Sequence, residues 1–149
     1  MDQIKFFMFM ASRQLERRQY SLAKANCERI LESQPRNTKA LNSLGLAWLG
    51  LASPGDESGP ARAISLFEKA LKHGAENTTS VRINLALAHK KSGRLQIALN
   101  ILGNLAKDKG LYNESLCQVV SVEKDLEKMI NSLCALIRHN SASGKVLYK

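Results

Sequence analysis

The sequence predicts an all-α protein, an α-solenoid built from stacked antiparallel helical hairpins. Apolar residues recur at steps of three and four along most of the chain, and no stretch alternates like a strand for more than a few residues. Three segments, 4–37, 38–77 and 79–112, can also be superposed at a spacing of about one helical hairpin. Stacked hairpins build a surface that can hold another chain, so the repeat favours binding over catalysis.

The first repeat, over about 4–37, carries small and apolar residues at helical spacing on both of its helices. These residues are Phe7, Met10, Ala11, Tyr20, Ala23, Cys27 and Ile30. Pro35 cannot continue a helix, and the Asn37 side chain can accept the free amide hydrogens of the next one. The sequence therefore predicts that a helix ends before Pro35 and that another begins at Thr38.

The second repeat, over about 38–77, begins with a helix predicted from Thr38 to Leu51. The segment 52–60 is dense in Ser, Gly, Asp and Pro, which indicates a surface loop longer than a tight hairpin turn. Pro60 suits the first turn of the following helix. Gly74 can take the left-handed conformation that ends this helix near His73.

The third repeat, over about 79–112, is predicted to begin at the capping residues Asn77, Thr78 and Thr79 and to contain helices ending near Lys91 and Asp108. Beyond it, apolar residues continue at steps that predict one long capping helix over about 113–138. This stripe consists of Leu116, Val119, Leu126, Ile130, Leu133 and Ile137. Glu123 lies in the stripe, so either the helix bends there or the carboxylate finds a basic partner. Residues 1–138 are expected to form a single domain, and 139–149 a flexible basic tail.

The 149 residues carry a formal net charge of +9, and the charge is unevenly distributed. The segment 79–112 holds six basic residues and one acidic residue, which gives it +5 of the total. Such a patch favours acidic partners, nucleic acid or anionic membrane surfaces through a field that salt weakens. A solvated helix face explains the same pattern.

The sequence indicates a cytoplasmic protein, or one peripheral to a membrane assembly, and it predicts no membrane span. The apolar run that begins at Phe6 is cut off by Arg13 before it reaches the length of a secretory signal. The three cysteines, Cys27, Cys117 and Cys134, form no C-x-x-C pair and are odd in number, as is typical of reduced thiols. We interpret them as small apolar packing residues.

No pattern in the chain indicates catalysis, a metal or a cofactor. His73, His89 and His139 have neither each other nor cysteines at ligand spacing, so no zinc site is expected. His89 is interpreted as a packed residue on a helix face. Serine, histidine and aspartate residues are scattered without a nucleophile elbow. The chain is therefore predicted not to be an enzyme.

The repeats resemble the tetratricopeptide family, whose pattern is W-x2-L-G-x2-Y followed by alanine, aromatic and proline positions. Leu41 stands at the tryptophan position, Leu44 and Gly45 match, and Trp48 replaces the tyrosine. Small residues also recur at the helix crossings of all three repeats, and they are Ala11, Gly45, Ala86, Ala23, Ala63 and Ala98. The chain departs from the family at Arg18, where glycine is usual, and in the insertion between Gly50 and Ala63. The resemblance implies a right-handed superhelix of three hairpins over about residues 4–112, followed by the long C-terminal helix.

The resemblance further implies a concave groove lined by the first helix of each hairpin. The family's groove positions correspond to Lys5, Met8, Ser12, Leu15, Lys39, Asn42, Leu46, Leu49, Ser80, Ile83, Leu87, Lys90 and Lys91. Apolar residues occupy the centre and lysines both ends, which suits a peptide segment with apolar anchors and acidic flanks. The expected function is that of a non-catalytic adaptor or chaperone-like module. Small three-repeat proteins that end in an extra helix, as this chain is expected to, resemble chaperones of bacterial secretion systems and assembly factors of adhesive pili.

Two alternatives to peptide binding remain at this stage. The basic residues of the third repeat could bind nucleic acid, although few aromatic residues are present to stack on bases. These residues are Arg82, Lys90, Lys91, Arg94, Lys107 and Lys109. The chain could also be a fragment of a longer tetratricopeptide scaffold.

Phe6 and Phe9 are candidates for an interface. In the family's geometry Phe7 and Met10 point into their own hairpin, whereas Phe6 and Phe9 face where a preceding repeat would pack. An uncovered apolar patch of this kind marks an interface with a second copy, with a partner or with the chain's own last helix. The alternative is that the run merely completes the first hairpin.

Overall fold

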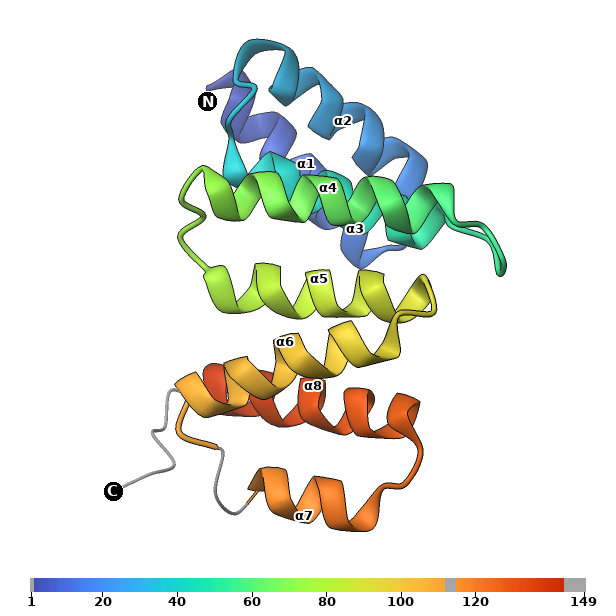
Figure 1. The fold of residues 1–149 in the computed structure, drawn as a ribbon. Helices are drawn as coiled ribbons and strands as arrows, with labels where there is room; N and C mark the ends of the chain where they lie inside the picture. Colours follow the sequence, from blue (N-terminus) through green and yellow to red (C-terminus); the bar gives the residue numbers. More distant parts are fainter. Residues whose placement is uncertain (1, 112–114, 144–149) are drawn as a thin grey trace. The chain divides into compact units, whose positions relative to one another are not determined.

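A computed structural model of the chain describes residues 2–111 and 115–143. Within these ranges the chain is all-helical and contains no strand, which confirms the predicted fold class at this level (Figure 1). The eight helices are α1 (Gln3–Glu16), α2 (Tyr20–Ser33), α3 (Thr38–Leu51), α4 (Ser58–Lys72), α5 (Thr78–Lys91), α6 (Leu95–Asp108), α7 (Ser115–Val122) and α8 (Leu126–Ser143). The end of the predicted third repeat and the start of the predicted capping helix, 112–114, lie outside the described residues, as does 144–149 of the predicted tail.

The structure divides into two compact units, Met1–Ala88 and His89–Lys149, so that the boundary falls within α5. In the first unit α1 packs on α2, α2 on α3 and α3 on α4, and α1 also contacts α3. The predicted helix from Thr38 to Leu51 has these bounds because Asn37 accepts a hydrogen bond from the Ala40 amide, at 3.0 Å. The extent of the predicted single domain stays a prediction.

Small residues bring the helices of the first unit close together. Ala11, Ala23 and Ala63 are completely buried, as expected for residues at helix crossings. Gly45 of α3 lies against the buried ring of Phe67 on α4, with no room for a side chain between them. The close approach predicted at Gly45 is therefore present, and a glycine permits it.

Two of the predicted turns use the left-handed conformation. Gly74 has a φ of 79°, which ends α4 without a steric penalty. Arg18, between α1 and α2, has a φ of 59° and is the only non-glycine residue with a positive φ in the described part of the chain. The turn therefore has the left-handed conformation in which glycine is usual, although the residue here is an arginine.

The second unit corrects the prediction of one long helix over 113–138. The structure has two helices there, α7 and α8, which pack on each other, and α8 also packs on α6. The chain leaves α7 after Val122, and the Asp125 carboxylate accepts a hydrogen bond from the Glu127 amide, at 2.8 Å, to start α8. The helix therefore ends at Val122, immediately before Glu123, so the chain breaks where the sequence suggested a bend.

Two smaller predictions also change in the second unit. Residues 139–143 belong to α8, so the predicted flexible tail does not begin at His139. Cys117 is exposed on α7, whereas Cys27 and Cys134 are buried as predicted. None of the described helices is long and apolar enough to cross a bilayer.

Candidate functional site

The predicted groove residues of the first unit lie on α1, α3 and α5, and most of them reach the surface. We use the term first-helix surface for those that are exposed or half-buried. They are Lys5, Met8, Ser12, Leu15, Lys39, Asn42, Leu46, Ser80 and Leu87. Two predicted members differ, because Leu49 is only 6% exposed and Ile83 only 3% exposed. These two side chains support the surface from beneath and offer little area to a ligand.

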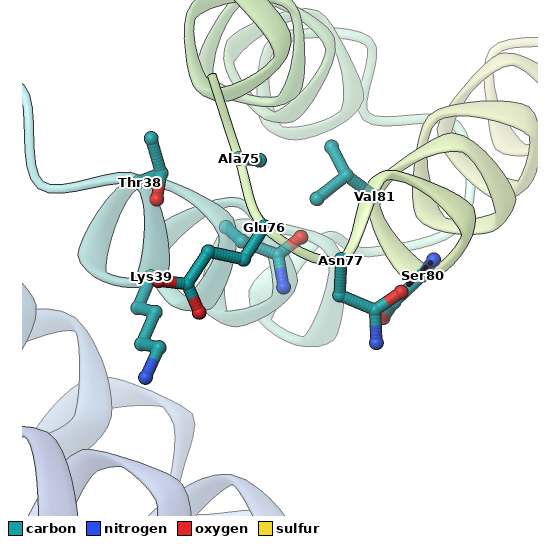
Figure 2. Close-up of a pocket in the computed structure, with 8 residues that line it drawn as sticks. Thr38, Lys39, Ala75, Glu76, Asn77, Ser80 and Val81 are labelled. Atoms are coloured by element: carbon teal, nitrogen blue, oxygen red, sulfur yellow. Dashed lines mark hydrogen bonds between the residues drawn. The ribbon is translucent and has the colours of Figure 1, made fainter. Parts of the chain in front are cut away.

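Three of the predicted residues line one hollow. Lys39, Asn42 and Ser80 border a cavity of about 180 Å³ between the start of α3 and the start of α5 (Figure 2). The connection between α4 and α5 closes it with Ala75, Glu76 and Asn77, and Thr38 and Val81 complete the lining. The structure therefore brings together residues that are about forty positions apart in the sequence, as the groove hypothesis requires.

Hydrogen bonds fix the side chains beneath and beside this hollow. The Asn84 amide group donates to Asn42 Oδ1 at 3.0 Å, which ties the middle of α5 to α3. Asn77 Oδ1 accepts from the Ser80 amide at 3.1 Å and caps α5, as predicted for this residue. Asn84 is buried and was not predicted as a functional residue, since its partner lies on another helix and no local spacing reveals the pair.

The hollow offers both signs of charge. Figure 2 shows the long side chains of Lys39 and Glu76 at its border, from α3 and from the α4–α5 connection. With the Asn42 and Asn77 amides and the Ser80 hydroxyl, the lining can both donate and accept hydrogen bonds. Leu46 follows Asn42 by one helical turn and is half-buried, so an apolar contact adjoins the polar hollow.

Lys90 and Lys91, the predicted basic end of the groove, belong to the second unit. The Lys90 ammonium lies 3.6 Å from a Glu127 carboxylate oxygen and donates to Asn131 Oδ1 at 2.8 Å. Both partners are on α8, so most of the charge of Lys90 is already balanced within its own unit. Lys91 is exposed.

The described residues were compared with the needs of a metal site and of a reactive thiol. No three histidine, cysteine or carboxylate side chains among them are close enough to share a metal ion. Burial raises the pKa of the Cys27 thiol to about 12, and burial also raises the pKa of Cys134. Both thiols therefore stay protonated at neutral pH, and a protonated thiol is a poor nucleophile.

Cations and aromatic rings meet at a second place that the sequence did not reveal. The Trp48 ring on α3 has the Lys24 ammonium at 4.8 Å and the Arg62 guanidinium at 4.5 Å from its centroid. Lys24 lies on α2 and Arg62 on α4, so the two cations clasp the indole from neighbouring helices. No spacing rule within one helix could have identified these partners. The indole and the two cations already contact one another within the chain, so we assign these cation–π contacts to the packing of α2, α3 and α4.

Phe6 and Phe9 are exposed to 47% and 54%, whereas Phe7 and Met10 are half-buried, as expected.

Comparisons of the chain with protein families, with curated proteins and with solved structures find no match. Assignment of a function therefore rests on the geometry of the described residues.

Proposed function

We propose that this chain is a non-catalytic, tetratricopeptide-like adaptor that binds an extended protein segment on its first-helix surface. The observation that supports the proposal is the hollow between α3 and α5, where Lys39, Asn42 and Ser80 meet without filling the space between them. A surface of amides, one ammonium and one carboxylate suits the backbone and polar side chains of a peptide. Leu46 beside it supplies an apolar contact.

The first-helix surface sets the kind of segment that would fit. Half-buried apolar residues, Met8, Leu15, Leu46 and Leu87, occur on all three helices, and lysines stand near the starts of α1 and α3. We expect the ligand to present apolar side chains along the helices and an acidic group to Lys39. The balanced charge of Lys90 makes it a weaker contributor than the sequence indicated.

Selection from a random peptide library displayed on phage tests the proposal. Selected peptides, labelled with a fluorophore, are titrated with the protein and followed by fluorescence anisotropy. Lys39→Glu and Leu46→Gln should each weaken binding at least about tenfold, which corresponds to about 1.4 kcal/mol. Matched controls are Lys72→Glu and Leu22→Gln, because both residues are exposed on second helices, Leu22 to 53%.

Equal affinity of the groove variants and the controls would contradict the proposal, provided that circular dichroism shows all variants to be folded. The same titration at several salt concentrations separates the nucleic-acid alternative. Phosphate contacts give a steep fall of affinity for single-stranded DNA or RNA with salt, whereas apolar anchors do not. A nucleic acid that binds tightly and loses affinity upon Arg94→Glu, while no peptide is selected, would favour the alternative.

A further inference from the structure

The outward side of α1 carries a short coiled-coil seam that stays exposed among the described residues. Asp2, Phe6, Phe9 and Arg13 are all exposed and follow one another at steps of four, three and four residues. Phe6, Phe9 and Arg13 lie on α1 at the alternation of a and d positions in a heptad repeat, which keeps side chains on one stripe of a helix, and Asp2 precedes them as the N-cap residue. Ala11 and Gln14, on the other side of α1, are buried in the hairpin. We call the four exposed residues the α1 seam.

The spacing of the α1 seam is the same in both directions and its two end residues carry opposite charges, and these two features together identify its partner. We propose that α1 pairs antiparallel with α1 of a second copy of this chain, about a twofold axis between residues 7 and 8. In this register Phe6 of each copy faces Phe9 of the other, and Asp2 of each copy faces Arg13 of the other. Such an isologous contact is the commonest way in which identical chains associate.

The charges select the antiparallel arrangement. In a parallel pair each Arg13 would lie beside Arg13 of the second copy, and each Asp2 beside Asp2, so both ends of the seam would repel. In the antiparallel pair each end joins opposite charges. Asp2 caps its own helix, with Oδ1 accepting from the Ile4 amide at 3.1 Å, and a carboxylate has a second oxygen for the incoming guanidinium.

Neighbouring side chains are compatible with this pairing. The Arg13 guanidinium already lies over the Phe9 ring, 5.7 Å from its centroid, and so extends along the seam. Beside the seam, the antiparallel register places Lys5 next to Ser12 of the second copy, so no like charges meet there. The four phenylalanines, the two cations and the two carboxylates of the pair therefore form one continuous strip across the twofold axis.

The area indicates a weak dimer. A phenylalanine has about 150–250 Å² of accessible surface, so four half-exposed rings contribute about 400 Å². A standard-size interface buries about 1,600 Å² in total, and the seam supplies about a quarter of it from aromatic surface. We expect dimers to form only at high protein concentration and to dissociate on dilution.

Sedimentation velocity of the full chain from about 1 µM to about 1 mM tests the pairing. The wild type should shift from the mass of one chain to that of two, and a Phe6→Ser, Phe9→Ser variant should stay monomeric. Arg13→Asp should weaken dimerisation more than about tenfold, because it places two carboxylates opposite each other at both ends. Arg36→Asp is the matched control, since Arg36 is exposed between α2 and α3 and makes the same change of charge.

Restoration of the pair completes the test. A chain carrying both Asp2→Arg and Arg13→Asp exchanges the charges and should dimerise more tightly than the Arg13→Asp variant. Far-UV circular dichroism shows whether each variant remains helical. A wild type that stays monomeric up to about 1 mM would overturn the proposal. The α1 seam would then either have no partner or bind a different protein. The proposal would also be overturned if the seam variants dimerised as tightly as the Arg36→Asp control.

Discussion

The contact of Gly45 with Phe67 allows a sharp test of how the helices of the first unit are held. A Cβ atom built on Gly45 would lie 2.7 Å from Phe67 Cζ and 2.9 Å from Cδ1, whereas carbon atoms pack at about 3.5–4.0 Å. Replacing glycine by alanine inside a helix gains about 1 kcal/mol of propensity. Overpacking a full core costs about 1–3 kcal/mol, and the buried Phe67 ring has little room to move. Three ring atoms lie less than 3.0 Å from this Cβ, so the cost falls at the upper end of this range, and we expect Gly45→Ala to lower the free energy of unfolding by about 1–2 kcal/mol.

Urea unfolding followed by the fluorescence of Trp48, the only tryptophan, measures this effect in the unit that contains Gly45. Phe67→Leu should relieve the clash, so that Gly45→Ala costs at least about 1 kcal/mol less in that background. Gly103→Ala in α6 is the matched control. No atom lies within 4 Å of a Cβ built there, so far-UV circular dichroism should show a gain of up to about 1 kcal/mol. A Gly45→Ala variant stabilised as much as Gly103→Ala would refute the reasoning.

Four further outcomes are expected. Arg18→Gly should raise the free energy of unfolding by about 1 kcal/mol, because it relieves a left-handed backbone, and an unchanged urea midpoint would contradict this. Asn84→Ala should lower the free energy of unfolding by about 1–2 kcal/mol, because it leaves the side-chain carbonyl of Asn42 without its donor. Equal stability of this variant and the wild type would contradict the prediction and show that water replaces the hydrogen bond. Iodoacetamide at pH 8 should modify the exposed Cys117 long before Cys27, as peptide mass spectrometry can measure. Burial raises the pKa of Cys27 to about 12, so between pH 9 and 12 the thiol ionises in the unfolded chain but not in the folded one. The contribution of this thiol to the free energy of unfolding therefore falls as the pH rises from 9 to 12. Cys27→Ala should flatten that part of the curve of stability against pH.

The helices that local signals delimit were predictable from the sequence. The predicted and observed bounds of α3 agree because Pro35 and Asn37 act within one turn of its start. The predicted end of α6 near Asp108 agrees as well, since Lys109 and Gly110 follow it. The small residues at the crossings were also informative, because backbone proximity requires them whatever the partner helix is.

The break between α7 and α8 escaped prediction because the apolar stripe keeps its phase across it. Val119 and Leu126 are seven residues apart, which one continuous helix and a hairpin of two helices satisfy equally. The signal that separates the two cases is Asp125, whose carboxylate caps α8 through the Glu127 amide. Periodicity reports which face is apolar, whereas a capping residue reports where a helix begins.

The candidate site was predictable only in part. Lys39, Asn42 and Ser80 were identified from the family resemblance, and they do line one hollow. The burial of Leu49 and Ile83 could not be predicted, because a shift of one position along a helix turns a groove residue into a core residue. The pairing of Lys90 with Glu127 depends on α8, whose start the sequence did not reveal.

The buried alanines of this chain have a consequence for how it tolerates change. Alanines on six helices have no exposed surface at all, among them Ala11, Ala23, Ala47, Ala63, Ala86 and Ala98. An alanine at a crossing has no rotamer to adjust, so a larger residue there can be admitted only by separating two backbones. A deep mutational scan should therefore find the least replaceable positions among the smallest residues, while the large aliphatic ones accept one another.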